Sequence, residues 1–324
     1  MAIIECSYFN DSRKTINHTT NNLGDCNITL SHFAHSLLSL HGSFGTNKSK
    51  IFRYFAYLLQ LKSDFSFNNR HWVMNKIPDD AYDGIKKMSD IYGAAVTIQI
   101  AQIKYGYPRV VCINPNMVSA GSKRPDFLAR RGNVYALFES KASINTVDSR
   151  AIKDGIDQLN AVAYVNDNGT IINTFNHLML VCTNFRHSIK TPKNKKVTCK
   201  IIDPDNNGDI IITLDTSKQI NEYYKFVKEI IESGSIVNNI TMEDKRIIAS
   251  RHVLDDTTVI IGMCDNLYDY NWDNEQKNTV NELLNFECRE ITNDNGYLFS
   301  DGVFVIVRSN KNKHGDFGRH YRAE

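Results

Sequence analysis

The stretch KRPDFLARRGNVYALFESKAS, residues 123–143, predicts a β-hairpin. Before the turn, apolar residues alternate with small or charged ones. Gly132 and Asn133 supply turn chemistry, and residues 134–142 resume as a run of β-branched and aromatic side chains. Counting outward from this turn determines which side chains share one face of the sheet.

The hairpin gathers two carboxylates and one ammonium on one face. With the two turn residues at its centre, Asp126 comes directly opposite Glu139, and their Cβ atoms are expected about 4.5 to 5.5 Å apart. The period of two puts Lys141 on the same face, beside Glu139. Like charges opposed across strands are destabilising unless something offsets them, and a divalent cation is the usual offset. The stretch therefore predicts a metal site at Asp126 and Glu139.

Composition is typical of a soluble globular protein. The chain has 324 residues, of which 42% are hydrophobic and 23% are charged, so it can form one elaborated domain or two. Its net charge is +2, and any nucleic-acid surface must therefore be local. There is no long apolar run and no signal-peptide pattern, and the seven cysteines never form a C-x-x-C pair. These features predict a cytoplasmic protein without a membrane span.

Helices and strands alternate along the middle of the chain. The segments expected there are a helix at 80–104, a strand at 109–113, the two strands of the hairpin, a helix from Thr146 or Asp148 to about Val165, and strands at 177–183 and 197–202. This order indicates a mixed α/β fold. We expect it to form a core over residues 80–205.

The flanking regions are expected to pack on this core. Residues 1–79 read as an N-terminal extension of loops and helices, with helices at 31–40 and 51–61. Residues 206–324 read as a C-terminal α/β addition. Its expected segments are a hairpin at 209–214, helices at 217–233 and 274–285, and strands at 258–263 and 302–308.

The hairpin also resembles a known signature. Pro125-Asp126, twelve residues, and then Glu139-Ser140-Lys141 is similar to the motif of the PD-(D/E)XK nuclease superfamily. The resemblance implies the restriction-endonuclease-like fold, which is a mixed sheet flanked by helices with an αβββαβ core. It places the aspartate on the second strand and E-x-K on the third. Residues 80–183 read in that order, so the resemblance covers roughly a third of the chain.

The resemblance implies a Mg²⁺-dependent endonuclease for which Mn²⁺ can substitute. Asp126 and Glu139 would hold the ion, and the backbone carbonyl of Ser140 would complete the protein ligands. Many members carry a further glutamate ligand on the first helix, and here the nearest acid is Asp90. The bound ion would polarise a phosphoryl oxygen and acidify a water.

Two further side chains receive catalytic roles from the resemblance. Lys141 would orient or activate the attacking water and stabilise the transition state. Gln158, on the following helix, would position these groups or the substrate. Many members have a tyrosine four residues after this glutamine, whereas here the tyrosine is Tyr164, so only Gln158 matches.

Basic clusters offer a track for nucleic acid. Residues 186–200 contain six Lys or Arg and no acid, and the C-terminal tail from Arg308 is also basic. The residues expected to bind nucleic acid are Lys123, Arg124, Arg130, Arg131, Lys190, Lys193, Lys195 and Lys196. The alternative that each cluster is only a solvated loop stays open.

Several functions stay open on the sequence alone. The first is a DNA endonuclease in restriction or antiviral defence, with a repair nuclease and a non-catalytic nucleic-acid-binding module as alternatives. The stretch GSFGTNKS, residues 42–49, has the length of a P-loop around Lys48, but Asn47 replaces its second glycine. RNA as substrate, a homodimer, and an ATPase, helicase or methyltransferase partner are also left open.

Overall fold

A computed structural model gives the fold. The chain forms two compact units, one from residues 1–28 and 63–216 and the other from residues 29–62 and 217–324. Within the described part of the chain, no helix is both long and apolar enough to cross a membrane. The described residues are 3–11, 21–42, 48–68, 71–75, 82–114, 117–118, 123–185, 197–204, 208–242, 244–272, 291–293 and 296–309.

The first unit is built on a nine-stranded mixed sheet. Its order is β3-β4-β1-β11-β10-β7-β6-β5, and β2 pairs with β1. Strands β5, β6 and β7 form an antiparallel meander, and β10 lies parallel beside β7. The strands are β1 (Ile3–Asp11), β2 (Asn21–Asn27), β3 (Phe65–Asn68), β4 (His71–Met74), β5 (Arg109–Cys112), β6 (Phe127–Arg131), β7 (Val134–Ser143), β10 (His177–Asn184) and β11 (Thr198–Pro204).

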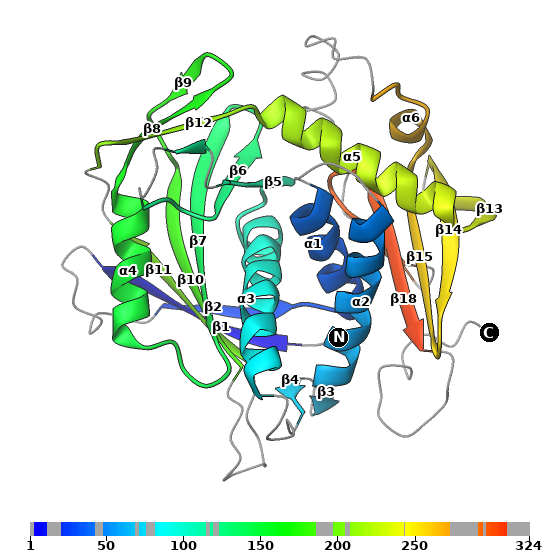
Figure 1. Ribbon diagram of the computed structural model, residues 1–324, viewed down its shortest axis with the longest axis horizontal. Helices are drawn as coiled ribbons and strands as arrows, with labels where there is room; N and C mark the ends of the chain where they lie inside the picture. The colour runs from blue at the N-terminus through cyan, green and yellow to red at the C-terminus, as the bar shows by residue number, and fades with distance from the viewer. Residues whose placement is uncertain are drawn as a thin grey trace. The chain divides into compact units, whose positions relative to one another are not determined.

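Two helices cover opposite faces of this sheet. Helix α3 (Tyr82–Gln99), extended by the π-helical turn η2 (Ile100–Lys104), approaches β7 where Gly93 faces Ala142. Helix α4 (Ser149–Asn160) approaches the other face where Gly155 meets Leu180 and Glu139. Successive strand residues point to opposite faces, so Ala142 and Glu139 assign the two helices to different sides. Figure 1 shows α4 and α3 on either side of β7 and β10.

Helix α4 is shorter than predicted. It ends at Asn160, and residues expected to continue it to about Val165 form strand β8 (Val162–Asp167). Apolar spacing favoured the helix, because Val162 and Val165, both buried, are three residues apart and would share one face of a helix but point to opposite faces of a strand. The expected hairpin at 209–214 is a single strand, β12 (Ile210–Leu214), parallel to β8. With β9 (Thr170–Ile172) these strands make a three-stranded sheet.

The unit boundaries also differ from the expected ones at 79/80 and 205/206. The N-terminal region contributes to both units: β1 to β4 join the first unit's sheet, and two helices join the second unit. Strand β1 pairs in parallel with β11, far away in sequence. Strand β2 is rich in asparagine and also contains glycine and aspartate, residues that are depleted in strands. Local sequence therefore carried little signal for β2.

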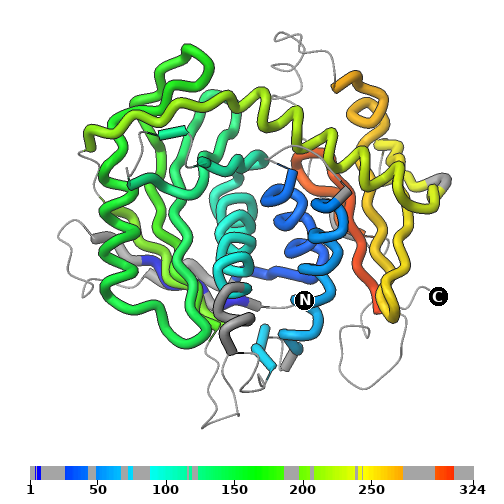
Figure 2. The backbone as a smooth tube through the Cα atoms, viewed as in Figure 1, coloured from blue at the N-terminus to red at the C-terminus, as the bar shows by residue number. Residues whose placement is uncertain are grey.

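The second unit combines helices with a six-stranded antiparallel sheet in the order β13-β14-β15-β18-β17-β16. Figure 2 shows β18 and β15 running side by side, as their pairing requires. The predicted helices at 31–40, 51–61 and 217–233 and strands at 258–263 and 302–308 are present, while the helix expected at 274–285 lies outside the described residues. The elements are α1 (Leu30–Gly42), α2 (Lys48–Asp64), α5 (Thr216–Ser233), α6 (Asp265–Tyr268), β13 (Ser235–Met242), β14 (Lys245–Leu254), β15 (Thr257–Cys264), β16 (Ile291–Asn293), β17 (Gly296–Leu298) and β18 (Val303–Ser309).

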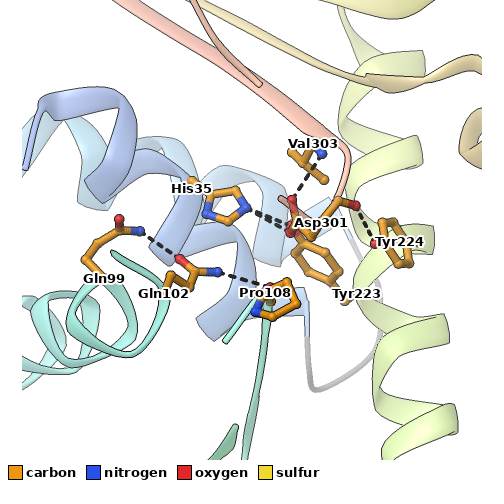
Figure 3. Close-up of polar contacts among 8 residues, drawn as sticks. All are labelled: His35, Gln99, Gln102, Pro108, Tyr223, Tyr224, Asp301 and Val303. Carbon is orange, nitrogen blue, oxygen red and sulfur yellow. Dashed lines mark hydrogen bonds and ion pairs between the residues drawn. The ribbon is translucent and has the colours of Figure 1, made fainter. Parts of the chain in front are cut away.

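A buried polar network holds the second unit together around Asp301 (Figure 3). His35 Nε2 lies 2.9 Å from Asp301 Oδ2, and the hydroxyl of Tyr223 donates to the same oxygen at 2.7 Å. The backbone N–H of Val303 donates to Oδ1, and the hydroxyl of Tyr224 donates to the Asp301 carbonyl. Burial alone would raise the pKa of Asp301, but His35 and these hydrogen bonds outweigh burial and lower it.

The lowered pKa of Asp301 predicts a pH-dependent stability. The ionised Asp301 carboxylate stabilises the folded state at pH values above the ordinary carboxyl pKa. This stabilisation is lost as pH falls through the lowered pKa that Asp301 has in the folded state. We expect Asp301→Asn to reduce the free energy of unfolding by about 2 kcal/mol at neutral pH, because it removes the charged acceptor of the buried hydrogen bonds from Tyr223 and Val303. The variant should also lose less stability than the wild type between neutral and acidic pH in urea melts.

The matched control is Asp255→Asn. Asp255 is exposed, and its φ of 51° is one that asparagine tolerates as well as aspartate. Its replacement should leave the urea midpoint and its pH dependence unchanged. Equal pH profiles for the wild type and Asp301→Asn would contradict the role assigned to the buried network.

Candidate functional site

The hairpin has the predicted register. Phe127 pairs with Phe138, so the next position outward brings Asp126 opposite Glu139. Gly132 has a φ of 55°, which is the left-handed conformation that its turn requires and that glycine adopts without strain. The predicted convergence of the two carboxylates therefore follows from local turn chemistry and the period of two.

Asp126 is held at the start of β6 from both sides. Its carbonyl accepts a hydrogen bond at 2.8 Å from the N–H of Ile113, the residue that directly follows strand β5. Its carboxylate Oδ2 accepts one from the backbone N–H of Ser140 at 2.9 Å, across the hairpin. Burial raises the pKa of Asp126, although the Ser140 N–H and the Lys141 charge oppose this effect. The carboxylate is therefore fixed in place but incompletely neutralised.

Glu139 is the most constrained group of the site. Its side chain is 0% exposed, Oε1 accepts a hydrogen bond from Lys141 Nζ, and Oε2 accepts none from the described residues. Burial raises the pKa of Glu139 well above its ordinary value, and the charge of Asp126 raises it further. A buried carboxylate with an unpartnered oxygen beside a second carboxylate requires a proton or a cation.

Lys141 and Gln158 complete the cluster. Lys141 Nζ donates to Gln158 Oε1 at 2.7 Å as well as to Glu139, and its side chain is 23% exposed. Gln158 Nε2 donates in turn to the carbonyl of Arg124 at 2.7 Å. The ammonium is thus fixed between the carboxylates and α4, while it keeps access to solvent. The resemblance pointed to Gln158, but nothing in the sequence pointed to its acceptor.

Gly155 allows α4 to lie close enough for these contacts. The helix begins where Asp148, one of the two predicted caps, accepts a hydrogen bond from the Ala151 N–H at 2.7 Å. A Cβ on Gly155 would lie 2.6 Å from Leu180 Cδ1 and 3.4 Å from Glu139 Cγ. The sequence contained this signal as a glycine inside an amphipathic helical pattern, and such a glycine often marks close packing.

The basic residues around the hairpin are mostly engaged with the protein itself. Lys123 Nζ lies 3.2 Å from Asp157 Oδ2, and Arg124 Nε donates to the carbonyl of Ile113. The guanidinium of Arg130 donates to the Gly132 carbonyl and lies over the Tyr135 ring, and Arg131 is exposed. The expected nucleic-acid contacts Lys190, Lys193, Lys195 and Lys196 lie outside the described residues. These roles stay predictions.

Two expected ligands stay predictions as well. Asp90 is an exposed residue of α3, and this helix packs on the face of β7 opposite to Glu139. The contact that Ser140 makes to Asp126 is through its N–H rather than its carbonyl. In the described part of the chain, no group of three or more His, Cys, Asp or Glu is arranged to hold a metal. A cation here would therefore be held by two carboxylates, with amide, backbone or water oxygens as further ligands.

The P-loop alternative has no support from the local fold. The stretch around Lys48 follows helix α1, which ends at Gly42, whereas a P-loop follows a strand. Residues 43–47, which would form the phosphate cradle, lie outside the described residues.

Comparison with known proteins identifies no relative. No family model, no curated protein and no solved structure matches the chain. The functional argument therefore depends on the geometry of the Asp126, Glu139, Lys141 and Gln158 cluster.

Proposed function

We propose that the chain is a divalent-cation-dependent nuclease that hydrolyses phosphodiester bonds of DNA. The observation that carries the proposal is the buried Glu139, whose Oε2 accepts no hydrogen bond from the described residues beside Asp126, while Lys141 binds its other oxygen. Two carboxylates supply the hard oxygen donors that Mg²⁺ prefers. The residues present therefore fit the ion.

The topology around the site supports the same proposal. Along the chain, α3 is followed by the meander β5-β6-β7 and then by α4; strands β8 and β9 of the small sheet come next, and then β10, which is parallel to β7. With β8 and β9 set aside as an insertion, this order is compatible with the αβββαβ core of the restriction-endonuclease-like fold that the resemblance implies. Asp126 directly precedes the second of these strands, and Glu139 and Lys141 lie on the third. A general mixed α/β fold does not require carboxylates at these positions.

The chemistry assigns a separate task to each side chain. A bound cation supplies Lewis-acid polarisation of a phosphoryl oxygen and neutralises charge. Asp126 and Glu139 would hold it, because both are fixed by the hairpin and the described residues neutralise neither of them fully. The Lys141 ammonium, held by Gln158, positions a water and stabilises the negative charge that develops on the phosphoryl group.

The experiment that tests the function is a cleavage panel. Purified protein is incubated with plasmid, linear duplex, single-stranded DNA and RNA, each with Mg²⁺, with Mn²⁺ and with a chelator. We expect cleavage of at least one DNA substrate only when a divalent ion is present. The absence of cleavage from every substrate would contradict the proposal. Metal-independent binding without cleavage would instead favour the non-catalytic module.

The biological setting is a further part of the proposal. Restriction or antiviral defence is the setting that we favour, and DNA repair is the alternative, by analogy with proteins of this expected fold. Sequence-specific cutting in the panel would favour restriction. Preference for nicked or otherwise damaged duplexes would favour repair.

A further inference from the structure

A second lysine shares the face of the candidate site. In the central sheet, Lys141 of β7 pairs with Cys182 of β10, and Cys182 pairs with Lys200 of β11. Residues paired across adjacent strands point to the same face. Lys200 therefore lies two strands from Lys141 on the face that carries Glu139. At about 4.8 Å per strand, the two backbone positions are about 10 Å apart.

Burial and electrostatics agree with this register. Cys182, between the lysines, is fully buried, whereas Lys200 is half-buried and Lys141 retains some exposure. Burial raises the pKa of the Cys182 thiol to about 12, while the charges of Lys200 and Lys141 both act to lower it. The charges of both ammoniums therefore affect the pKa of the same thiol, as expected if the two lysines lie on the same face of the sheet.

We propose that Lys200 binds the phosphate next to the one presented to Asp126 and Glu139, so that it positions the nucleic-acid strand beside the site. This inference rests on the proposed function. Each lysine has a flexible four-carbon stem, so two lysines can each bind one of two neighbouring phosphates, whereas a single lysine can bind only one. Lys200 also takes part in another polar interaction within the protein, so a bound phosphate would join an existing partner.

A positioning lysine has a measurable signature in the salt dependence of binding. Each phosphate contact contributes a slope of about −0.9 to log K against log salt for duplex DNA, and about −0.7 for a single strand. Removing one contact should therefore make the slope shallower by about that amount. If affinities converge at about 1 M salt, binding at about 0.15 M should weaken about fivefold.

The test uses the full chain carrying Glu139→Gln, which we expect to bind substrate without cutting it. Fluorescence anisotropy of a labelled DNA duplex is measured over a series of salt concentrations without divalent ions. Adding Lys200→Gln should make the negative slope shallower by about 0.9 and weaken binding about fivefold, whereas Lys200→Arg should restore both. The matched control is Lys153→Gln, since Lys153 is an exposed lysine of α4 in the same unit and should change neither quantity.

Cleavage kinetics give an independent readout of the same role. In the otherwise wild-type chain, Lys200→Gln should raise KM while kcat is largely kept, because a positioning contact acts on binding. An unchanged slope and KM in a chain that binds and cleaves DNA would overturn the role of Lys200 alone. Neither binding nor cleavage by the wild type would overturn the proposed function and the inference together.

Discussion

Replacing Glu139 by glutamine is expected to lower the rate of cation-dependent DNA cleavage by about 10²-fold or more. Glutamine keeps the shape of the side chain but removes the negative charge that holds a cation. Lys141→Met should cause a loss of similar order, because it removes the ammonium but keeps an apolar stem of similar length. Cleavage of a labelled duplex under single-turnover conditions measures both effects.

Stability measurements distinguish this loss from unfolding. The pKa of Glu139 is raised in the folded state, so its ionised form destabilises the fold as pH rises from the ordinary carboxyl pKa through the raised value. Glu139→Gln removes this cost and should melt no lower than the wild type at neutral pH without divalent ions. Lys153→Ala, on the exposed side of α4, should cut at the wild-type rate. Equal cleavage by the wild type and Glu139→Gln would contradict the catalytic role.

Gly155→Ala is expected to damage both the site and the fold. The added methyl group would lie 2.6 Å from Leu180 Cδ1, and Leu180 is fully buried and has little space to move. Overpacking of this kind costs about 1 to 3 kcal/mol. It should also push α4 away from β7 and thereby loosen the hydrogen bond between Gln158 and Lys141. We expect a lower urea midpoint and a cleavage rate reduced by about tenfold or more.

A double-mutant cycle tests the steric explanation. Leu180→Val removes the Cδ atoms that the new methyl group would meet. The loss of unfolding free energy in the double variant should therefore be smaller than the sum of the losses in the two single variants. The difference, the coupling free energy, should be about 1 kcal/mol. Strict additivity would show that Gly155 acts through something other than contact with Leu180.

The hairpin was predictable because its signals are local. Gly132 lies in the turn with a positive φ, and the period of two then assigns Asp126, Glu139 and Lys141 to one face. The cap at Asp148 was predictable for the same reason, since its side chain bonds to a backbone N–H three residues away. Each of these features depends on neighbours in the chain.

Features that depend on distant partners were not predictable. Residues 162–167 form a strand because β12 pairs with them, and no local sequence pattern predicts that pairing. Strand β1 joins the sheet through β11, and the helices α1 and α2 join a unit whose sheet comes much later in the chain. The acceptor of Gln158, the carbonyl of Arg124, is likewise set by how α4 packs on the sheet.

The most direct test of the central claim is a titration of the protein with Mn²⁺, followed by the electron paramagnetic resonance signal of the free ion. We expect the wild type to bind a single Mn²⁺, and binding should tighten as pH rises through the raised pKa of Glu139, because protons compete for the carboxylate. Asp126→Asn and Glu139→Gln should each abolish this binding, while Asp255→Asn should not. Equal binding by the wild type and both site variants, or no binding by the wild type, would contradict the account.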